Sequence, residues 1–178
     1  MASTPSVAGS GRLFLYAAIS LVVAGCGSSM DVKTYRDPGL RIPPSATYAW
    51  HPAQPARRLP EELDPRVDNP TIHGRVKQAV ETVLAEKGFR QVEEAAANFL
   101  VSYRVGIREQ HQWQQVTAGA RMSVIPVEYT EGGLMITLVE RTTGKLVFQS
   151  LGLSDVSQGG GSEKAIQDAV TEALKDLP

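Results

Sequence analysis

Few side chains in this sequence have the types and spacing that catalysis or metal binding requires. The chain has one cysteine, Cys26, and three histidines, His51, His73 and His111. No histidine lies in a zinc motif such as His-Glu-x-x-His, and no serine lies in a Gly-x-Ser-x-Gly elbow. We interpret the histidines as solvated side chains and expect no catalytic residue, no metal site and no cofactor.

Cys26 is the residue with the clearest chemical context. It follows an apolar run that begins at Leu13, and the residues directly before it, Val23, Ala24 and Gly25, are small. The run is shorter than the roughly 20 residues that a bilayer-spanning helix needs. The arrangement resembles the lipobox of bacterial lipoproteins, in which the thiol accepts diacylglycerol and a signal peptidase recognises the small residues. An ordinary signal peptide with a chance cysteine is the alternative.

The lipobox resemblance divides the chain into a signal peptide (1–25), a lipidated tether (26–29) and a single periplasmic domain (30–178). Two or more acyl chains on Cys26 would anchor the protein stably to a membrane. Gly27 stands where lipoproteins retained in the proteobacterial inner membrane carry aspartate. The resemblance therefore implies the outer membrane, facing the periplasm, with the inner membrane as the alternative.

The charge balance argues against nucleic acid as a partner. The chain has 18 Lys and Arg against 19 Asp and Glu, a formal net charge of −1, whereas a nucleic-acid-binding domain shows a basic face. A single cysteine also excludes an intramolecular disulfide. The domain must therefore be stabilised by its own apolar core.

Apolar periodicity predicts two amphipathic helices. The first is expected from about Pro70 to Lys87, with Asn69 as its N-cap and Gly88 just past its C-terminus. Ser162 caps the second helix. The apolar positions recur every three or four residues: Ile72, Val76, Ala79, Val80, Val83 and Leu84 in the first helix, and Ile166, Ala169, Val170, Ala173, Leu174 and Leu177 in the second.

Alternating polar and apolar residues predict six strands, joined late in the chain by short turns. Turns are expected at Glu131–Gly133 and Arg141–Gly144, and Pro126 marks an edge or bulged strand. The element order is β-β-α-β-β-β-β-α, which indicates an α+β two-layer sandwich: a mostly antiparallel sheet with both helices packed on one face. The predicted strands are 31–36, 46–50, 98–110, 122–130, 134–140 and 145–154.

A polar segment, Glu109–Ala120, joins two of these strands as a predicted loop and contains Trp113. Because exposed tryptophan is enriched at binding hot spots, Trp113 is a candidate partner contact. Two alternatives remain open: the tryptophan folds back over the sheet edge, or the segment is a glutamine-rich extension of the strand. Trp50 ends a strand and is expected in the core.

Three pairs of segments have a characteristic order and spacing: Tyr35–Pro38 with Thr47–Trp50, Glu86–Phe89 with Ala97–Tyr103, and Tyr129–Ile136 with Gly144–Ser150. Together they resemble the lipoprotein-associated domain of unknown function 4136, a family common in Gram-negative bacteria. The family usually has aspartate at the place of Asn98 and often Trp-Arg-Gly at the place of Phe148–Ser150. The resemblance covers most of residues 30–177 and implies the fold and an envelope location, without an established activity.

Three functions are compatible with these features. The favoured one is a membrane-anchored, non-catalytic envelope lipoprotein that binds or scaffolds an envelope protein or lipid through its sheet or the segment around Trp113. The second is a lipid-handling accessory of an envelope transport or assembly system, which predicts an apolar cavity beneath the second helix. The third, an envelope hydrolase, would need a cleft with convergent titratable groups.

Overall fold

The structure is a computed structural model that describes residues 30–178 apart from 40–41, 44, 53–68, 119–120 and 158. Cys26 and the residues before it, Val23, Ala24 and Gly25, lie outside the described residues, as does the rest of the predicted signal peptide. Near the outer end of the β4–β5 hairpin the structure describes the backbone of residues 113, 114, 116–118 and 121–124 but not their side chains.

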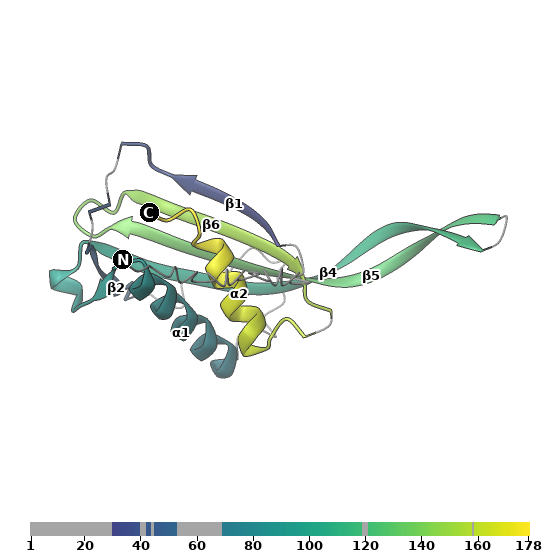
Figure 1. Ribbon diagram of the computed structural model, residues 1–178, viewed down its shortest axis with the longest axis horizontal. Helices are drawn as coiled ribbons and strands as arrows, with labels where there is room; N and C mark the ends of the chain where they lie inside the picture. Colours follow the sequence, from purple (N-terminus) through teal and green to yellow (C-terminus); the bar gives the residue numbers. More distant parts are fainter. Residues whose placement is uncertain (1–29, 40–41, 44, 53–68, 119–120, 158) are drawn as a thin grey trace, which may run out of the picture.

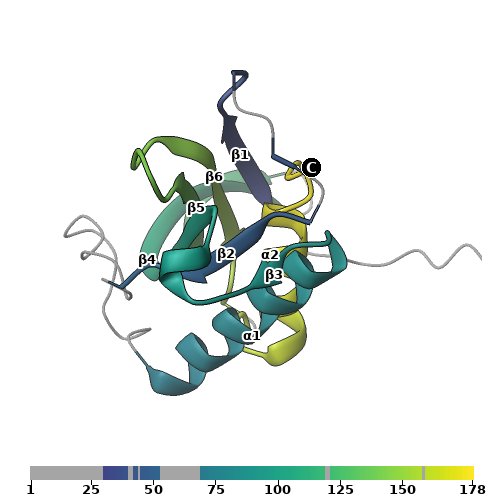
Figure 2. The ribbon, with the colours of Figure 1, turned by 90° about the vertical axis from the view of Figure 1, so that its left-hand side faces the viewer.

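Six strands form one sheet in the order β1-β6-β5-β4-β2-β3. In this order, β1 pairs with β6, β6 with β5, and β5 with β4, and all three pairs are antiparallel. The short strand β2 is parallel to both of its neighbours, β4 and β3. Both helices lie on one side of the sheet (Figure 2), so the predicted α+β sandwich is confirmed. The elements are β1 Asp31–Arg36, β2 Thr47–Trp50, α1 Pro70–Glu86, β3 Arg90–Gln91, the 3-10 turn η2 Glu94–Ala96, β4 Phe99–Ala118, β5 Arg121–Glu140, β6 Leu146–Asp155 and α2 Glu163–Ala173.

Local signals start and stop the helices as predicted. The Asn69 side chain accepts a hydrogen bond from the Thr71 amide at 2.8 Å, and Pro70 occupies the first turn of α1. Gly88 ends α1 with φ at 85°, a conformation that costs glycine little. The Ser162 side chain accepts from the Ala165 amide at 3.2 Å at the start of α2.

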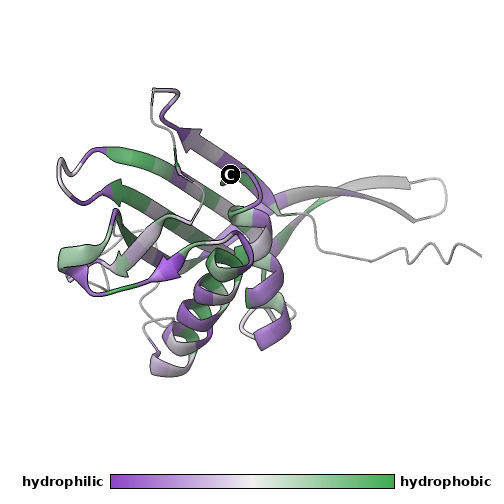
Figure 3. Cartoon of the chain, turned by 60° about the vertical axis from the view of Figure 1, so that its left-hand side comes forward, coloured by the Kyte–Doolittle hydropathy of each residue, from purple (hydrophilic) through white to green (hydrophobic). Residues whose placement is uncertain are grey.

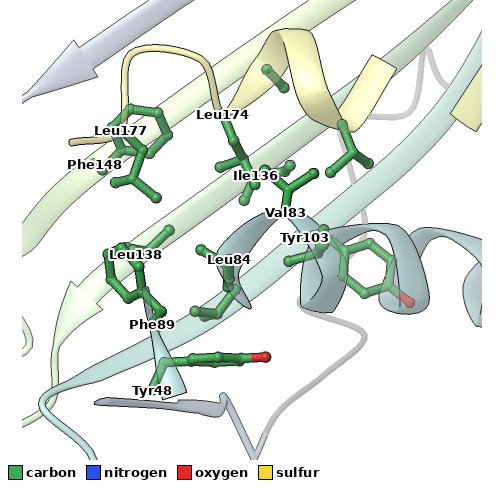
Figure 4. Packing of buried hydrophobic residues seen from close by; sticks show 14 of the residues in the cluster. Tyr48, Val83, Leu84, Phe89, Tyr103, Ile136, Leu138, Phe148, Leu174 and Leu177 are labelled. Carbon is green, nitrogen blue, oxygen red and sulfur yellow. The ribbon is translucent and has the colours of Figure 1, made fainter. Parts of the chain in front are cut away.

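The core lies between the apolar faces of the two helices and the inner face of the sheet (Figures 3 and 4). Trp50 is half-buried against this core, and its indole Nε1 donates to Glu81 Oε1 at 2.9 Å. Along the inner parts of β4 and β5, every second side chain points toward the helices, as expected for a sheet with one covered face. The largest fully buried side chains include Phe148, Leu84, Ile136, Leu138, Leu174 and Leu177.

The structure corrects two sequence predictions about the β4–β5 region. Glu109–Ala118 is not a loop, and Glu131–Gly133 is not a turn, because β4 and β5 pair continuously over 20 residues each. Gly132 and Gly133 lie within β5, where Gly132 permits a close approach: an added Cβ would stand 2.6 Å from a methyl carbon of Val156. The predicted strands 122–130 and 134–140 are therefore one strand.

Candidate functional site

The outer end of the β4–β5 hairpin projects beyond the rest of the sheet (Figure 1). We call this part the arm, and define it as Gln110–Ala118 of β4 together with Arg121–Tyr129 of β5. The pairing of β6 with β5 begins at Glu131, and β2 pairs with β4 only at Phe99–Val101. Among the residues that the structure describes, no third strand pairs with the arm.

The register of the arm places a row of glutamines opposite a row of apolar residues. Gln110 faces Tyr129 and Gln112 faces Val127. β-Branched and aromatic residues favour extended backbone, which explains why this segment continues the strand rather than ending it. The alternative of a glutamine-rich strand extension is therefore the one that the structure bears out.

Apolar surface on the arm is exposed. The Ile125 side chain is 43% exposed, whereas Val127 and Tyr129 are half-buried. A two-stranded ribbon with no third strand and no covering layer is at best marginally stable in water. An uncovered strand edge is also a ready template for pairing with another chain. The arm thus combines the backbone and side-chain features of a protein-binding element.

Polar contacts fix the root of the arm to the rest of the sheet. Arg108 Nε donates to Glu131 Oε2 at 2.7 Å across the two strands, and Thr130 Oγ1 donates to Glu109 Oε2 at 3.0 Å. The Thr130 amide donates to Ser157 Oγ at 2.9 Å, in the segment that follows β6. These bonds fix where the arm leaves the domain, so its direction is set by the folded core.

A groove lies next to the root of the arm, beneath α2. It encloses about 1290 Å³, more than the roughly 300–1,000 Å³ of typical ligand pockets. Its walls are mainly apolar and come from both helices, the sheet and the first described residue, and they include Met30, Ile72, Val105, Leu134, Ile166 and Ala169. This location matches the cavity that the lipid-handling hypothesis predicted beneath the second helix.

The candidate partner contact, Trp113, lies in β4 opposite Pro126 on β5. Its backbone therefore belongs to the arm, while its side chain is outside the part that the structure describes. Pro126 lies in β5 before β6 joins it at Glu131, so the predicted edge position of this proline is confirmed. The sequence therefore misassigned the conformation of this segment, which is a strand and not a loop.

The three histidines do not share one environment. His111 is exposed, with its Nδ1 3.7 Å from Glu128 Oε1 across the arm, and His51 is half-buried. The solvated interpretation is wrong for His73, whose Nδ1 lies 3.1 Å from the Tyr103 hydroxyl. That hydroxyl is also placed to donate to the His73 carbonyl oxygen at 3.1 Å, since β4 faces α1 here. Burial raises the pKa of Tyr103 above its usual value.

One buried carboxylate, Asp37, was missed as a structural residue. It forms an ion pair with Lys145 and accepts a hydrogen bond from the Gly39 amide at 3.0 Å. The Lys145 ammonium, followed by that amide, lowers the pKa of Asp37. The pair connects the end of the edge strand β1 to the turn that precedes its neighbour β6, so its role is to hold these two strands together.

The described residues contain neither a metal-ligand cluster nor a membrane-spanning helix. Within the described ranges, no group of three or more His, Cys, Asp or Glu side chains could hold a metal ion. In the same part of the chain, no helix has the length and apolar character needed to cross a bilayer.

Comparison with known proteins identifies the family. Residues 32–178 match the family described as "Domain of unknown function (DUF4136)", and the chain belongs to that family. No curated protein matches the sequence significantly.

Two solved structures match most of this chain. A PDZ domain protein from Parabacteroides distasonis is 10% identical with a TM-score of 0.50, and the match covers 85% of this chain and 35% of that one. This chain thus spans about a third of that protein's length. PelC from Paraburkholderia phytofirmans, solved as a dodecamer, is 14% identical with a TM-score of 0.47, over 82% of this chain and 96% of that one. At these identities the similarity concerns the fold alone.

Proposed function

We propose that this member of the DUF4136 family is a lipid-anchored, non-catalytic envelope protein whose arm binds an extended segment of another envelope protein. The observation that carries the proposal is the arm itself: two paired strands that project from the sheet with exposed apolar surface. Ordinary folding stability does not explain such a ribbon, because it adds little to the core. Contact with a partner does explain it.

Strand addition is the binding mode that fits the arm. A partner segment that pairs with the outer edge of β5 would gain main-chain hydrogen bonds along Arg121–Tyr129, and its alternate side chains would supply specificity. Ile125 and Val127 are two residues apart, so they lie on one face of the strand. The partner segment should therefore carry apolar residues at alternate positions on the matching face.

The anchor is the second part of the proposal. Cys26 follows Val23, Ala24 and Gly25 as in a lipobox, and Met30, at the start of the described domain, comes four positions later. A tether this short would keep the domain close to the membrane surface. We place the protein on the periplasmic side of the outer membrane, with the inner membrane as the alternative, and partners reached by the arm would then be other envelope components.

Site-specific photocrosslinking in cells tests the binding role. A photoreactive amino acid at Ile125 should capture a discrete protein, whereas the same residue at Ala85, exposed on α1 away from the arm, should not. Replacing Val127 with lysine in the Ile125-labelled chain should abolish the capture, because a charge on the edge opposes strand pairing. Identical capture patterns from the two positions would contradict the proposal.

Palmitate labelling tests the anchor separately. The wild-type chain should incorporate the label and partition into the detergent phase, while Cys26→Ala should do neither and should accumulate as uncleaved precursor. Equal labelling of the two chains would contradict lipidation at Cys26.

The groove beneath α2 favours a second candidate function, that of a lipid-handling accessory lipoprotein. Its apolar walls and its volume of about 1290 Å³ suit an acyl chain. A groove that serves lipid transfer must accept lipid from another molecule. Saturable binding of added phospholipid by the wild-type chain that is lost when Ala165 in the groove is replaced by tryptophan would favour this function over the first.

A further inference from the structure

The groove beneath α2 has a mainly apolar lining from elements far apart in the sequence. Ile166 and Ala169 of α2 form one wall, and Ile72 of α1 contributes to the other. Val105 and Leu134, on β4 and β5, form the floor. In Figure 1, α2 lies across the sheet close to the root of the arm. An unbranched hydrocarbon is the kind of molecule that such a lining would exclude from water.

The start of the domain lies in this groove. Met30, the first described residue, is one of the lining residues, and its side chain lies directly over Gly152. A Cβ added at Gly152 would come within 2.6 Å of the Met30 methyl carbon, so the glycine leaves room for this side chain. Methionine is flexible and fills irregular apolar gaps, which makes it easily displaced by another apolar group.

Cys26 is close enough to deliver an acyl chain to the groove. It precedes Met30 by four positions, and four extended residues span at most about 13–14 Å. The glyceryl group on the Cys26 sulfur would therefore lie within that distance of the groove. No other lipid source is tied to the groove by the covalent chain.

The charges at the rim favour this source over a free lipid. The charged residues among the described lining are Lys164, Asp168 and Glu172. Lys164 Nζ forms an ion pair with Asp168 Oδ2 at 2.5 Å, and Glu172 Oε1 pairs with Lys175 Nζ, also at 2.5 Å. The charges of these three lining residues thus sum to −1, which disfavours the phosphate of a phospholipid or a fatty-acid carboxylate at this part of the rim. The thioether-linked diacylglycerol of a lipoprotein carries no charge and fits this rim.

We infer that the groove shelters an acyl chain of the protein's own Cys26 lipid while the protein is out of a membrane. The inference rests on the lipidation part of the proposed function. In a bilayer all acyl chains of the Cys26 lipid are buried together, so the acyl chain leaves the groove. In water between membranes, the groove covers one acyl chain that would otherwise be exposed. Met30 then occupies the groove only when the acyl chain has left it.

A photoreactive fatty acid incorporated in cells tests the inference on the full-length lipidated protein. After dilution from detergent into lipid-free buffer, illumination should join the label to peptides from α2 and from β5 around Leu134. Adding vesicles of phosphatidylethanolamine and phosphatidylglycerol should reduce these intramolecular products at least fivefold. Products spread over the whole domain, or joining two copies of the chain, would overturn the inference.

A matched pair of variants makes the test specific for the groove. Ala165 is a half-buried lining residue on α2, and Ala165→Trp should fill the groove and lower the intramolecular product at least fivefold. Ala85→Trp places the same side chain on the exposed face of α1 and should change nothing. If Ala165→Trp lowers the melting temperature, the smaller Ala169→Met replaces it. Undiminished product in a folded, groove-filled variant would overturn the inference.

The failures of the two proposals are distinguishable. A wild-type chain that takes up no label contradicts lipidation, and with it the anchor. A chain that is labelled at Cys26 but not crosslinked to the groove leaves the anchor intact and overturns only the shelter. Saturable binding of added phospholipid by the wild-type chain that is lost in Ala165→Trp would assign the groove to an external lipid and likewise overturn the shelter.

Discussion

The two halves of the β4–β5 hairpin share one ladder of backbone hydrogen bonds but differ in everything that surrounds it. In the inner half, Phe99, Val101 and Tyr103 alternate toward the helices and are buried. In the arm, the β4 positions that continue this alternation hold His111, Trp113 and Gln115, and in the described part of the chain no helix or further strand covers the ribbon. The inner half therefore contributes to the stability of the fold, and the arm is available for contact with another molecule.

The largest expected effect is on the inner half. Leu84 is fully buried between α1 and the sheet, so Leu84→Ala should lower the free energy of unfolding by about 2–5 kcal/mol. Urea denaturation of the purified protein measures this. Gln78→Ala, on the exposed face of the same helix, is the control and should change the free energy by less than about 0.5 kcal/mol. Similar losses in both variants would show that this helix face is not the core-facing one.

The arm should respond in the opposite way. Trp113→Ala and Ile125→Lys should leave the melting temperature nearly unchanged and weaken partner capture at least tenfold, since the arm contributes little to the core. Thermal melts beside in-cell crosslinking measure the two effects. A loss of about 3 kcal/mol or more in Trp113→Ala would instead place the tryptophan over the sheet, as for large aromatic truncations in a core.

A smaller effect tests how α1 is fixed to the sheet. The Tyr103 hydroxyl lies within hydrogen-bond distance of the His73 carbonyl oxygen and of His73 Nδ1. Tyr103→Phe keeps the ring and should cost about 0.5–1.5 kcal/mol, the net contribution of a typical hydrogen bond. Urea denaturation should show this loss without any change in partner capture. A loss of capture would mean that the inner half and the arm are not independent.

The smallest effect is a pH dependence at the sheet edge. Lys145 holds the pKa of Asp37 below that of the unfolded chain, so the ion pair stabilises the fold above the unfolded pKa of about 3.9. That stabilisation is lost as the pH falls through the lowered folded pKa. Asp37→Asn should therefore be less stable than the wild type at neutral pH, and the difference should shrink in acid. A difference that stays constant from neutral to acidic pH would contradict the role of the ion pair.

The sequence predicted the helices well because their signals are local. Asn69, Gly88 and Ser162 each act within one turn of helix, and the apolar stripe of α1 lies on the face that the structure buries. The β4–β5 region was harder to predict, because Gly132 and Gly133 are compatible with a turn and equally with a strand whose backbone is contacted closely by another side chain. What decides between them is the pairing of Gly132 with Ile107 of β4 and with Ser154 of β6, which depends on the tertiary fold. The parallel pairing of β2 with β4 likewise depends on long-range contacts.

The candidate site could be predicted from the sequence only in part, for the same reason. Trp113 made this segment a candidate, but a run of glutamines does not reveal whether a chain forms a loop or a projecting strand. The groove depends on Met30, Ile72 and Ile166, which are brought together only by the tertiary fold. The sequence does contain one indication of the groove, which is the set of glycines at 152, 160 and 161. Their small size lets side chains approach the backbone closely.

Hydrogen exchange tests the central claim most directly, because it compares the two halves of one hairpin in a single experiment. The full-length protein is measured in membranes isolated from the cells that produce it, where we propose that it is anchored, and after purification in detergent. We predict that the backbone amides of 121–129 exchange rapidly in the purified protein and at least tenfold more slowly in the membranes, whereas those of 134–140 are slow in both. Equal exchange of 121–129 in the two preparations would contradict the account, because the arm would then have no partner in the envelope.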